Sequence, residues 1–275
     1  MSQAYHNLFS VENKVIVITG GTGVLGSVMA KALAQGGARM VIVGRRIDAG
    51  NNLVAEIEKQ GGTAIALKAD VLKREDLESV KKETLSRFGT IDILINAAGG
   101  NMPGATIPPD KTFFDLDTKA FQQVVDLNLL GTVLPSQVFG EVMALNKKGI
   151  IINVSSMAAH KPITRVVGYS AAKAAIDNFT QWLAVEMAKK VGEGIRVNAI
   201  APGFFITEQN RTLLTNPDGS LTARGKAVIA QTPFARFGEP GELIGVLIWL
   251  CSDASQFVTG VNVPVDGGFT SFFGV

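Results

Sequence analysis

Residues 14–26 read KVIVITGGTGVLG, a short apolar run that meets a glycine-rich turn. The run is β-branched, as a buried strand should be, and an amphipathic helical pattern over residues 24–35 follows the turn directly. Glycines let the backbone turn sharply and approach a pyrophosphate, whose charge is favoured by the free N–H groups of a helix N-terminus. A glycine turn also occurs without any ligand. The strand before it and the helix after it favour the dinucleotide-binding interpretation.

The same alternation continues along the chain. Six further short apolar runs are typical of strands, at residues 39–43, 64–68, 91–95, 149–154, 195–200 and 261–265. Helical patterns lie between them, at residues 49–60, 74–88, 118–145, 169–191 and 242–251. Repeated strand–helix–strand units imply right-handed crossovers and a parallel sheet. We therefore predict an α/β Rossmann fold, a doubly wound seven-stranded parallel sheet with helices on both faces.

No repeat or linker divides the sequence, so we predict one domain over residues 1–275. Its cofactor-binding half covers about 14–155, and its catalytic and substrate-loop half covers about 156–275. Pro264 in the last apolar run favours an edge strand. Residues 99–117 and 207–225 are irregular and follow strand ends, at the edge where open α/β sheets bind ligands. The second of these contains the turn signal NPDG.

Composition excludes several classes of protein. The chain has 275 residues, 47% of them hydrophobic and 18% charged, with 26 basic against 24 acidic side chains. This balance disfavours disorder and gives no basis for nucleic-acid binding. Cys251 is the single cysteine and His6 and His160 are the only histidines, so a closed zinc site is excluded and no metal is expected. Without a signal-peptide plan or a spanning apolar run, we predict a soluble, cytoplasmic protein that binds neither membrane nor nucleic acid.

The end of the second strand bears on the choice of nucleotide. A dinucleotide without a 2′-phosphate is normally held there by a carboxylate on the ribose hydroxyls. This chain has Gly44, Arg45 and Arg46 instead, and two guanidiniums could hold a phosphate. On this argument NADP(H) is narrowly favoured over NAD(H). The alternative is that Arg45 stacks on adenine and Arg46 is a solvated surface charge.

The helix predicted over residues 169–191 begins with two candidate catalytic side chains, Tyr169 and Lys173. Tyr169 and Lys173 are four residues apart, so they share one face, and a nearby cation lowers the pKa of a phenol. Ser156 lies just past a strand, where its hydroxyl can hydrogen-bond a carbonyl oxygen at the sheet's edge. Taken alone, the tyrosine and lysine are an ordinary surface pair of a helix.

Together these motifs resemble the short-chain dehydrogenase/reductase family along essentially the whole chain. The resemblance departs from the family at Val24, where a glycine is usual, and at Ala97, where a second asparagine is commoner. The resemblance rests on eight motifs in order, and it implies these cofactor-binding residues: Gly20, Thr22, Gly23, Val24, Leu25, Gly26, Asp70, Val71, Asn96, Ala97, Gly99, Tyr169, Lys173, Pro202, Gly203 and Thr207. The charge argument above adds Arg45 and Arg46.

The resemblance also implies a nicotinamide-dependent carbonyl reductase or alcohol dehydrogenase. Ser156 would polarise the substrate oxygen, and Tyr169 would give or take the proton. Lys173 would lower the pKa of Tyr169 and hold the nicotinamide ribose. Asn128 would fix a water molecule that connects Lys173 to solvent. The family's usual assembly implies a homotetramer or a dimer, formed through the helices at 118–145 and 169–191. Burial of the apolar tail 269–275 in a neighbouring subunit would suit this assembly, although the tail could equally pack on its own chain.

Within the family, the chain is most similar to the D-mannonate oxidoreductase (fructuronate reductase) group, at residues 96–103, 169–182, 201–211 and 263–275. This implies a small polar keto substrate, and polar groups in the loops suit hydroxyls and a carboxylate. The candidates for substrate contact are Asn101, His160, Lys161, Arg165, Gln209, Asn210 and Arg211, of which Asn101, Arg165, Asn210 and Arg211 are the leading four.

Three matters stay open at the sequence level. The group is associated with NADH, which conflicts with the argument from Gly44, Arg45 and Arg46. A reductase of 3-oxoacyl or polyol/gluconate substrates is the enzymatic alternative. A protein that senses the dinucleotide without turning it over is the non-catalytic alternative, and such proteins typically lack the tyrosine or the lysine.

Overall fold

Seven parallel strands form one sheet in the order β3-β2-β1-β4-β5-β6-β7, in a computed structural model that describes residues 7–207 and 210–274. The strands follow the predicted runs within one or two residues: β1 Val15–Thr19, β2 Arg39–Gly44, β3 Thr63–Lys68, β4 Ile93–Asn96, β5 Gly149–Val154, β6 Ile195–Pro202 and β7 Asn262–Val265. Every neighbouring pair is parallel. The prediction of a seven-stranded doubly wound Rossmann fold is confirmed.

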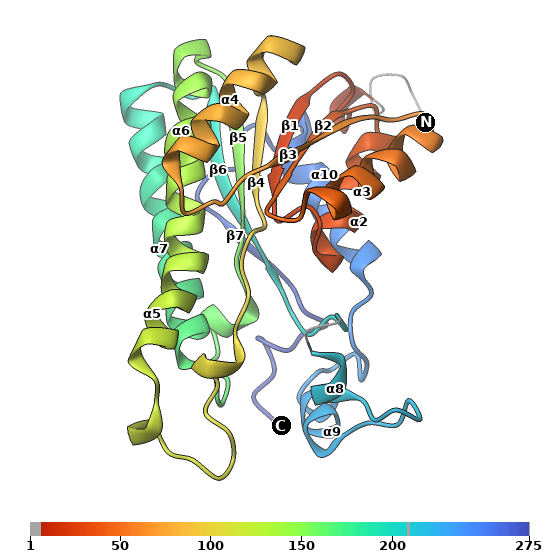
Figure 1. Cartoon of the computed structure of the whole chain (residues 1–275), viewed down its shortest axis with the longest axis vertical. Helices are drawn as coiled ribbons and strands as arrows, with labels where there is room; N and C mark the ends of the chain where they lie inside the picture. The colour runs from red at the N-terminus through yellow and green to blue at the C-terminus, as the bar shows by residue number, and fades with distance from the viewer. Residues whose placement is uncertain (1–6, 208–209, 275) are drawn as a thin grey trace.

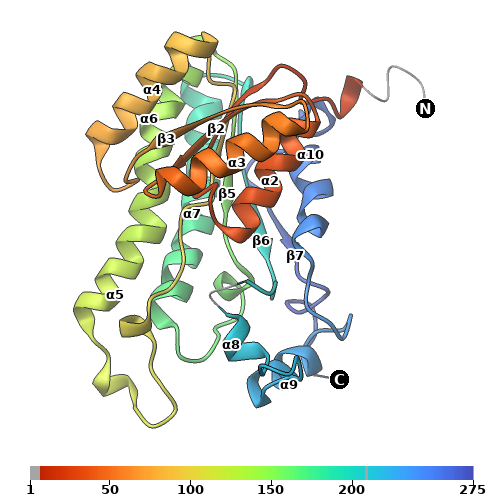
Figure 2. The same cartoon turned by 45° about the vertical axis from the view of Figure 1, so that its right-hand side comes forward.

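Helices cover both faces of this sheet (Figures 1 and 2). On one face lie α2 Val24–Gln35, α3 Ile47–Lys59 and α10 Ile244–Cys251. On the other face lie α4 Arg74–Phe88, α6 Gly131–Asn146 and α7 Val167–Lys190, with α5 Thr118–Val125 continuing the line of α6. Two separate apolar cores result, one on each side of the strands.

The burial of each strand explains its place in the sheet. All residues of β1, β4 and β6 are buried, as expected for near-continuous apolar runs covered on both faces. In contrast, β7 is only partly buried and Pro264, which has no N–H to donate, is exposed. The prediction of an edge strand for this segment is therefore confirmed.

Two predicted helices are not α-helical over their whole length. The helix expected over residues 118–145 is divided by a π-helical segment, η3 Asp126–Leu130, between α5 and α6. The helix expected over 242–251 begins with a 3₁₀ turn, η5 Pro240–Leu243, because the proline at its start sets the first turn. The spacing of apolar residues in the sequence does not show where a helical turn contains one extra residue. The π-helical segment η3 could therefore not be predicted.

The second irregular loop also contains more structure than expected. Two short helices, α8 Arg211–Leu214 and α9 Ala223–Ala230, lie in and just after it. The predicted turn at Asn216 is present, since Gly219 N donates to the Asn216 carbonyl at 3.0 Å. In both views α8 and α9 lie beyond the carboxyl ends of β6 and β7 (Figures 1 and 2). They form a small lobe beside the strand ends that carry the candidate active site.

Candidate active site

The glycine turn links the end of β1 to α2. Gly20 has φ +66°, and a Cβ on it would lie 2.6 Å from the Ala97 carbonyl oxygen. A Cβ on Gly26 would lie 2.4 Å from the Gly20 carbonyl oxygen. Only glycine fits at these two positions, because β1 and β4 converge here and the helix begins against the turn. The turn therefore brings the N-terminus of α2 directly to the carboxyl edge of the sheet.

This helix N-terminus suits an anionic group. Gly23 is the N-cap of α2, it is exposed, and no side chain caps the helix. A Cβ on Gly23 would meet only the Gly20 carbonyl oxygen at 3.3 Å, so the space beside it is open. Thr22, Val24 and Leu25 are partly exposed at the same end. The residues predicted to hold the dinucleotide pyrophosphate thus fit such a group.

The end of β2 lies beside this turn. A Cβ on Gly44 would be 3.5 Å from Thr22 Oγ1, an ordinary van der Waals contact, so a side chain is tolerated there. Arg45 and Arg46 are exposed, and Arg46 Nη2 donates to the Thr22 carbonyl at 3.2 Å. Among the described residues, neither arginine forms an ion pair with a carboxylate. The position thus carries two guanidiniums and no carboxylate for a ribose.

Asp70 and Val71 follow β3. The Asp70 carboxylate accepts from Leu72 N at 3.1 Å, which turns the chain after the strand. Val71 is 6% exposed, and a Cβ on Gly131 would be 3.0 Å from its Cγ2. Val71 therefore packs the end of β3 against the start of α6.

Asn96, predicted to contact the cofactor, forms hydrogen bonds inside the protein. Its side chain is buried, and its Nδ2 donates to Ser136 Oγ and to Asn153 Oδ1, each at 2.9 Å. Both donors of the amide therefore tie β4 to β5 and α6, and a contact of Asn96 with the cofactor stays a prediction. Gly99, three residues later, is exposed, and a Cβ there would be 2.6 Å from Asn128 Oδ1.

The predicted catalytic side chains are brought together by β5 and α7. Lys173 is 4% exposed, its Nζ donates to the Val154 carbonyl at 2.7 Å, and Nζ lies 5.6 Å from the centroid of the Tyr169 ring. Ser156 is 7% exposed, caps the 3₁₀ turn η4 Met157–Ala159 and hydrogen-bonds Tyr169. The hydroxyl, the phenol and the ammonium thus meet at the carboxyl edge of the sheet.

Burial dominates the electrostatics of this cluster. It raises the pKa of Tyr169, and the hydrogen bond with Ser156 opposes the rise. Burial also lowers the pKa of Lys173 to about 8, against the opposing charge of Asp177. The Lys173 ammonium is directed to the Val154 carbonyl, and the expected lowering of the Tyr169 pKa by Lys173 stays a prediction.

Asn128 lies in the middle of the π-helical segment η3. Its Nδ2 donates to the Gly100 and Val124 carbonyls, both at 2.8 Å, and its Oδ1 accepts from Gly100 N at 3.1 Å. The side chain therefore fixes the start of the loop that follows β4. Such π segments in helices often occur at functional sites, and this one places a buried amide against the catalytic loop.

A second polar cluster supports the first and was not predicted. Asp177 follows Lys173 by four residues on α7, and Ser155 Oγ donates to Asp177 Oδ1. His160 Nε2 lies 3.4 Å from Asp177 Oδ2, and Asn262 Nδ2 lies 3.2 Å from His160 Nε2. The cluster ties the segment around Ser155 to α7 and β7. The sequence signal that could have found it is the repeated four-residue spacing from Tyr169 through Lys173 to Asp177.

Residues after β6 form the side of the site expected to face the nicotinamide. Pro202 is buried at the end of β6, and Gly203 and Thr207 are partly exposed. Asn210 closes this segment, because its Oδ1 accepts from Thr207 N and its Nδ2 donates to the Phe205 carbonyl, both at 2.8 Å. Asn210, a candidate for substrate contact, thus shapes the loop with its own side chain.

The remaining substrate candidates differ from one another in their hydrogen bonds and in their exposure to solvent. Asn101 Nδ2 donates to Thr106 Oγ1 at 2.7 Å, while its buried Oδ1 has no partner. Arg211 is exposed at the start of α8, and Arg165 is half-buried. Gln209 lies outside the described residues. Asn101 and Arg165 thus retain hydrogen-bonding capacity close to the catalytic segment.

The C-terminal segment contacts the same region of its own chain. Lys161 Nζ donates to the Phe269 carbonyl at 2.9 Å and to the Phe272 carbonyl, and it lies 4.8 Å from the centroid of the Phe273 ring. The rings of Phe204 and Phe269 pack edge to face, 5.3 Å between centroids. Lys161, a candidate for substrate contact, therefore anchors this segment, although Phe273 stays 85% exposed.

Two features are absent from residues 7–207 and 210–274. They contain no cluster of three or more histidine, cysteine or acidic side chains able to hold a metal ion. None of their helices has the length and apolar character needed to cross a bilayer.

Known proteins resemble the chain over nearly its full length. A family model described as enoyl-(acyl carrier protein) reductase matches residues 23–270. An uncharacterized oxidoreductase UxuB of Bacillus subtilis is 48% identical over 275 residues, which cover 97% of this chain and 98% of the relative.

Two solved structures extend the comparison. A candidate D-mannonate oxidoreductase from Haemophilus influenza with bound NAD superposes with a TM-score of 0.91 at 45% identity, covering 98% of this chain and 100% of that chain. A gluconate 5-dehydrogenase from Burkholderia cenocepacia in complex with NADP and tartrate superposes with a TM-score of 0.86 at 30% identity, covering 98% and 99%. The two structures hold different dinucleotides.

Proposed function

The chain belongs to the short-chain dehydrogenase/reductase family of oxidoreductases, and we propose that it interconverts a keto group and a secondary alcohol on a sugar acid of the D-mannonate/fructuronate type. The observation that carries the proposal is the hydrogen-bonded pair of Ser156 and Tyr169 with the buried Lys173 beside it, at the edge where the glycine turn opens. NAD(P) is the cofactor class, and when bound its nicotinamide supplies or accepts the hydride.

The side chains of this site have distinct tasks in the proposed reaction. Ser156 donates a hydrogen bond to the substrate oxygen and so fixes and polarises the carbonyl. In the direction of reduction, the Tyr169 hydroxyl gives its proton to that oxygen, and in oxidation the phenolate takes it back. Lys173 holds the nicotinamide ribose and stabilises the phenolate. Asn128 holds the loop at Gly100 and the water that returns protons to Lys173.

Polarity supports the substrate class. The segments around the site carry half-buried Arg165 and exposed Arg211, which suit a carboxylate better than a long acyl chain. Two relatives point the same way, one a candidate D-mannonate oxidoreductase and the other a gluconate 5-dehydrogenase with tartrate bound.

For the cofactor, we propose NAD(H) as the working dinucleotide with NADP(H) also accepted. The relative at 45% identity holds NAD, which runs against the NADP(H) preference expected from Arg45 and Arg46. Those two arginines are exposed and lack carboxylate partners, and Gly44 leaves space, so a 2′-phosphate meets no repulsion there.

We further propose a cytoplasmic homotetramer. The outer faces of α6 and α7 expose large apolar side chains, with Leu145, Trp182 and Val185 exposed by 80%, 59% and 55%. Burial against a second copy would remove these side chains from water. Light scattering at micromolar concentration should give the mass of four chains, and a monomer would contradict the proposal.

Reduction assays test the proposed reaction directly. The protein is mixed with NADH or NADPH and with D-fructuronate, 5-ketogluconate, the neutral ketose D-fructose or a 3-oxoacyl thioester, and the reduced-nicotinamide absorbance is followed. We expect turnover with the sugar acids and little with the ketose or thioester. Turnover of the thioester alone would replace the substrate class, and no turnover of any substrate would favour the dinucleotide-sensing alternative.

A further inference from the structure

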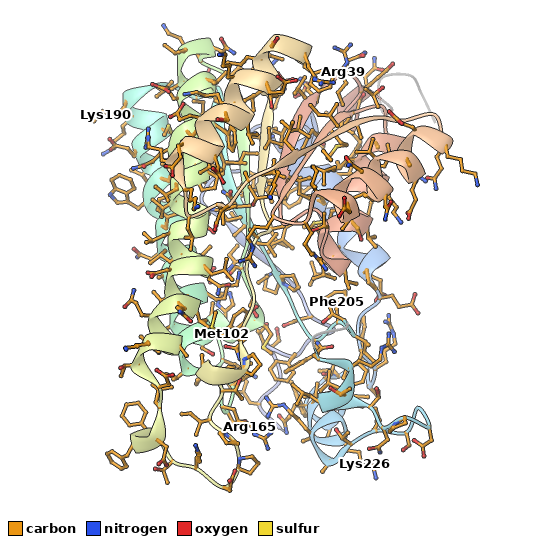
Figure 3. The ribbon with its side chains drawn as sticks, in the orientation of Figure 1. Arg39, Met102, Arg165, Lys190, Phe205 and Lys226 are labelled. Atoms are coloured by element: carbon orange, nitrogen blue, oxygen red, sulfur yellow. The ribbon has the colours of Figure 1, made fainter. Side chains whose placement is uncertain are left out.

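Two half-buried arginines from different segments lie close enough for their positive charges to interact. Arg165 lies between η4 and α7, four residues before Tyr169, and Arg224 lies in the first turn of α9. The guanidinium of Arg224 reaches the residue next to Arg165: Nη1 donates to Thr164 Oγ1 at 3.2 Å and Nη2 to the Thr164 carbonyl at 3.5 Å. In Figure 3, Arg165 lies between Met102 on one side and the helix that carries Lys226 on the other.

The pair carries like charges with no counter-charge. Among the described residues, no carboxylate forms an ion pair with Arg165 or with Arg224. Burial lowers the pKa of Arg224, and the positive charge of Arg165 lowers it further. Two neighbouring guanidiniums that are partly removed from water repel each other, so the arrangement is unfavourable until an anion lies between them.

The backbone at Arg165 is held in an uncommon conformation. Its φ of +76° lies in the left-handed region, which residues with a Cβ rarely adopt because the Cβ approaches the following carbonyl oxygen. The surroundings fix it there, since the Arg165 carbonyl accepts from Ile107 N at 3.0 Å. Thr164 and Arg165 thus join the loop after β4 to α9, and strain of this kind concentrates at ligand-binding positions.

We propose that Arg165 and Arg224 together bind the carboxylate of the substrate. Each guanidinium presents a planar fork of donors that matches a carboxylate, and an anion between them relieves their repulsion. The bound anion would also hold the lobe of α8 and α9 against the loop after β4. The inference rests on the proposed sugar-acid function and names its carboxylate subsite, of which Arg224 was not a sequence candidate.

Calorimetry with the whole chain saturated with NAD, in a Tyr169→Phe background in which D-mannonate is not consumed, tests this subsite. D-mannonate is the anionic probe and D-mannitol is its neutral counterpart. Arg224→Met and Arg165→Met should each weaken D-mannonate binding at least about tenfold, which corresponds to about 1.4 kcal/mol. Affinity for D-mannitol and for NAD should not change. Arg224→Lys should recover only part of the loss, because lysine keeps the charge and lacks the fork.

A matched control comes from the same helix. Lys226 is exposed on α9 two residues after Arg224, so Lys226→Met removes one positive charge without touching the pair. It should leave D-mannonate affinity unchanged. Arg165→Gly removes the guanidinium while relieving the left-handed backbone, so its loss of affinity cannot be attributed to unfolding when its melting temperature is maintained.

The outcomes separate this subsite from the proposed reaction. Unchanged D-mannonate binding in both Met variants, an equal loss in Lys226→Met, or no binding by the wild type overturns the pair as a carboxylate site. If the sugar acids are turned over while the Met variants bind normally, the proposed function stands and the subsite falls. If D-mannonate binding depends on both arginines but no sugar acid reacts, the subsite stands and the proposed reaction falls.

Discussion

The two sides of the candidate site are built differently. On the sheet side, Asn128, Ser156 and Lys173 are at most 7% exposed and come from helices or strand ends that are fixed by hydrogen bonds. On the opposite side, residues 99–117, 204–207 and 210–232 form turns and short helices, with half-buried or exposed side chains such as Arg224 and Arg211.

This contrast predicts different roles for the two sides of the site, proton transfer on the sheet side and substrate selection on the loop side. Groups that transfer a proton must be held to a fraction of an ångström, and a closely packed sheet edge provides that precision. Loops with few buried contacts open at low free-energy cost and can vary without loss of the fold. We therefore expect the rigid side to determine the class of reaction and the loop side to select the substrate.

The largest effect is expected on the rigid side, at Tyr169. Tyr169→Phe removes the proton donor and keeps the ring, so kcat with the sugar acid should fall by about 10²–10⁴-fold. NADH affinity, measured by fluorescence titration, should stay within about twofold. Activity within about tenfold of the wild type would show that another group transfers the proton. The sheet side would then no longer be the side that supplies the proton donor.

The glycine turn should be the next most sensitive place. In Gly26→Ala the new Cβ would lie 2.4 Å from the Gly20 carbonyl oxygen, so the turn must shift, at a cost of roughly 1–3 kcal/mol. Urea unfolding should show this loss together with weaker NADH binding. Gly245→Ala in α10 is the control, because a Cβ there has no neighbour within 4 Å. Equal stability of the two variants would contradict the close approach at Gly26.

A smaller effect is expected at the exposed adenosine end of the groove. Replacing Arg45 and Arg46 by alanine should weaken NADPH about tenfold, since charge-assisted bonds of about 1.5–3 kcal/mol are reduced by exposure to solvent. NADH should change little, and Gly44→Asp should shift the kcat/KM ratio further towards NADH. An equal loss for both dinucleotides would show that the arginines contact a part that they share.

The smallest effect is a shift in pH dependence at Asp177. Its carboxylate raises the pKa of Lys173, which burial has lowered to about 8. In Asp177→Asn that support is lost, the pKa falls further, and the ammonium deprotonates at lower pH. The alkaline limb of kcat/KM should move to lower pH.

The other titratable group facing Asp177 is His160, 3.4 Å from its Oδ2. His160→Gln therefore serves as the control, and Asp177→Glu should restore the wild-type limb. If the alkaline limb of kcat/KM does not move in Asp177→Asn, the cluster around Asp177 has only a structural role.

Much of the sheet and of the catalytic cluster could be predicted from the sequence. The apolar runs mark strands buried on both faces, and parallel strands bring their carboxyl ends, with Gly20 and Ser156, to one edge. The four-residue spacing of Tyr169 and Lys173 places both on one helix face.

Side-chain direction and tertiary partners could not be predicted. Asn96 sits in a motif at the end of β4, but the motif does not say whether its amide faces the groove or the interior, and here it is buried. Asn210 is polar and near the site, yet its amide closes its own turn. Arg224 is 59 residues after Arg165 in the chain, and only the folded lobe brings it to Thr164.

The order of strands also shapes how the chain is made. A ribosome releases β1 to β4 first, and because β4 pairs with β1, four strands can assemble before any of β5 exists. The outer edge of β4 then stays unpaired while the interval from Asn96 to Gly149 is synthesised, about 3–10 s at typical rates. Its residues ILIN are all buried in the finished sheet. During biosynthesis this apolar edge is where aggregation competes most directly with folding.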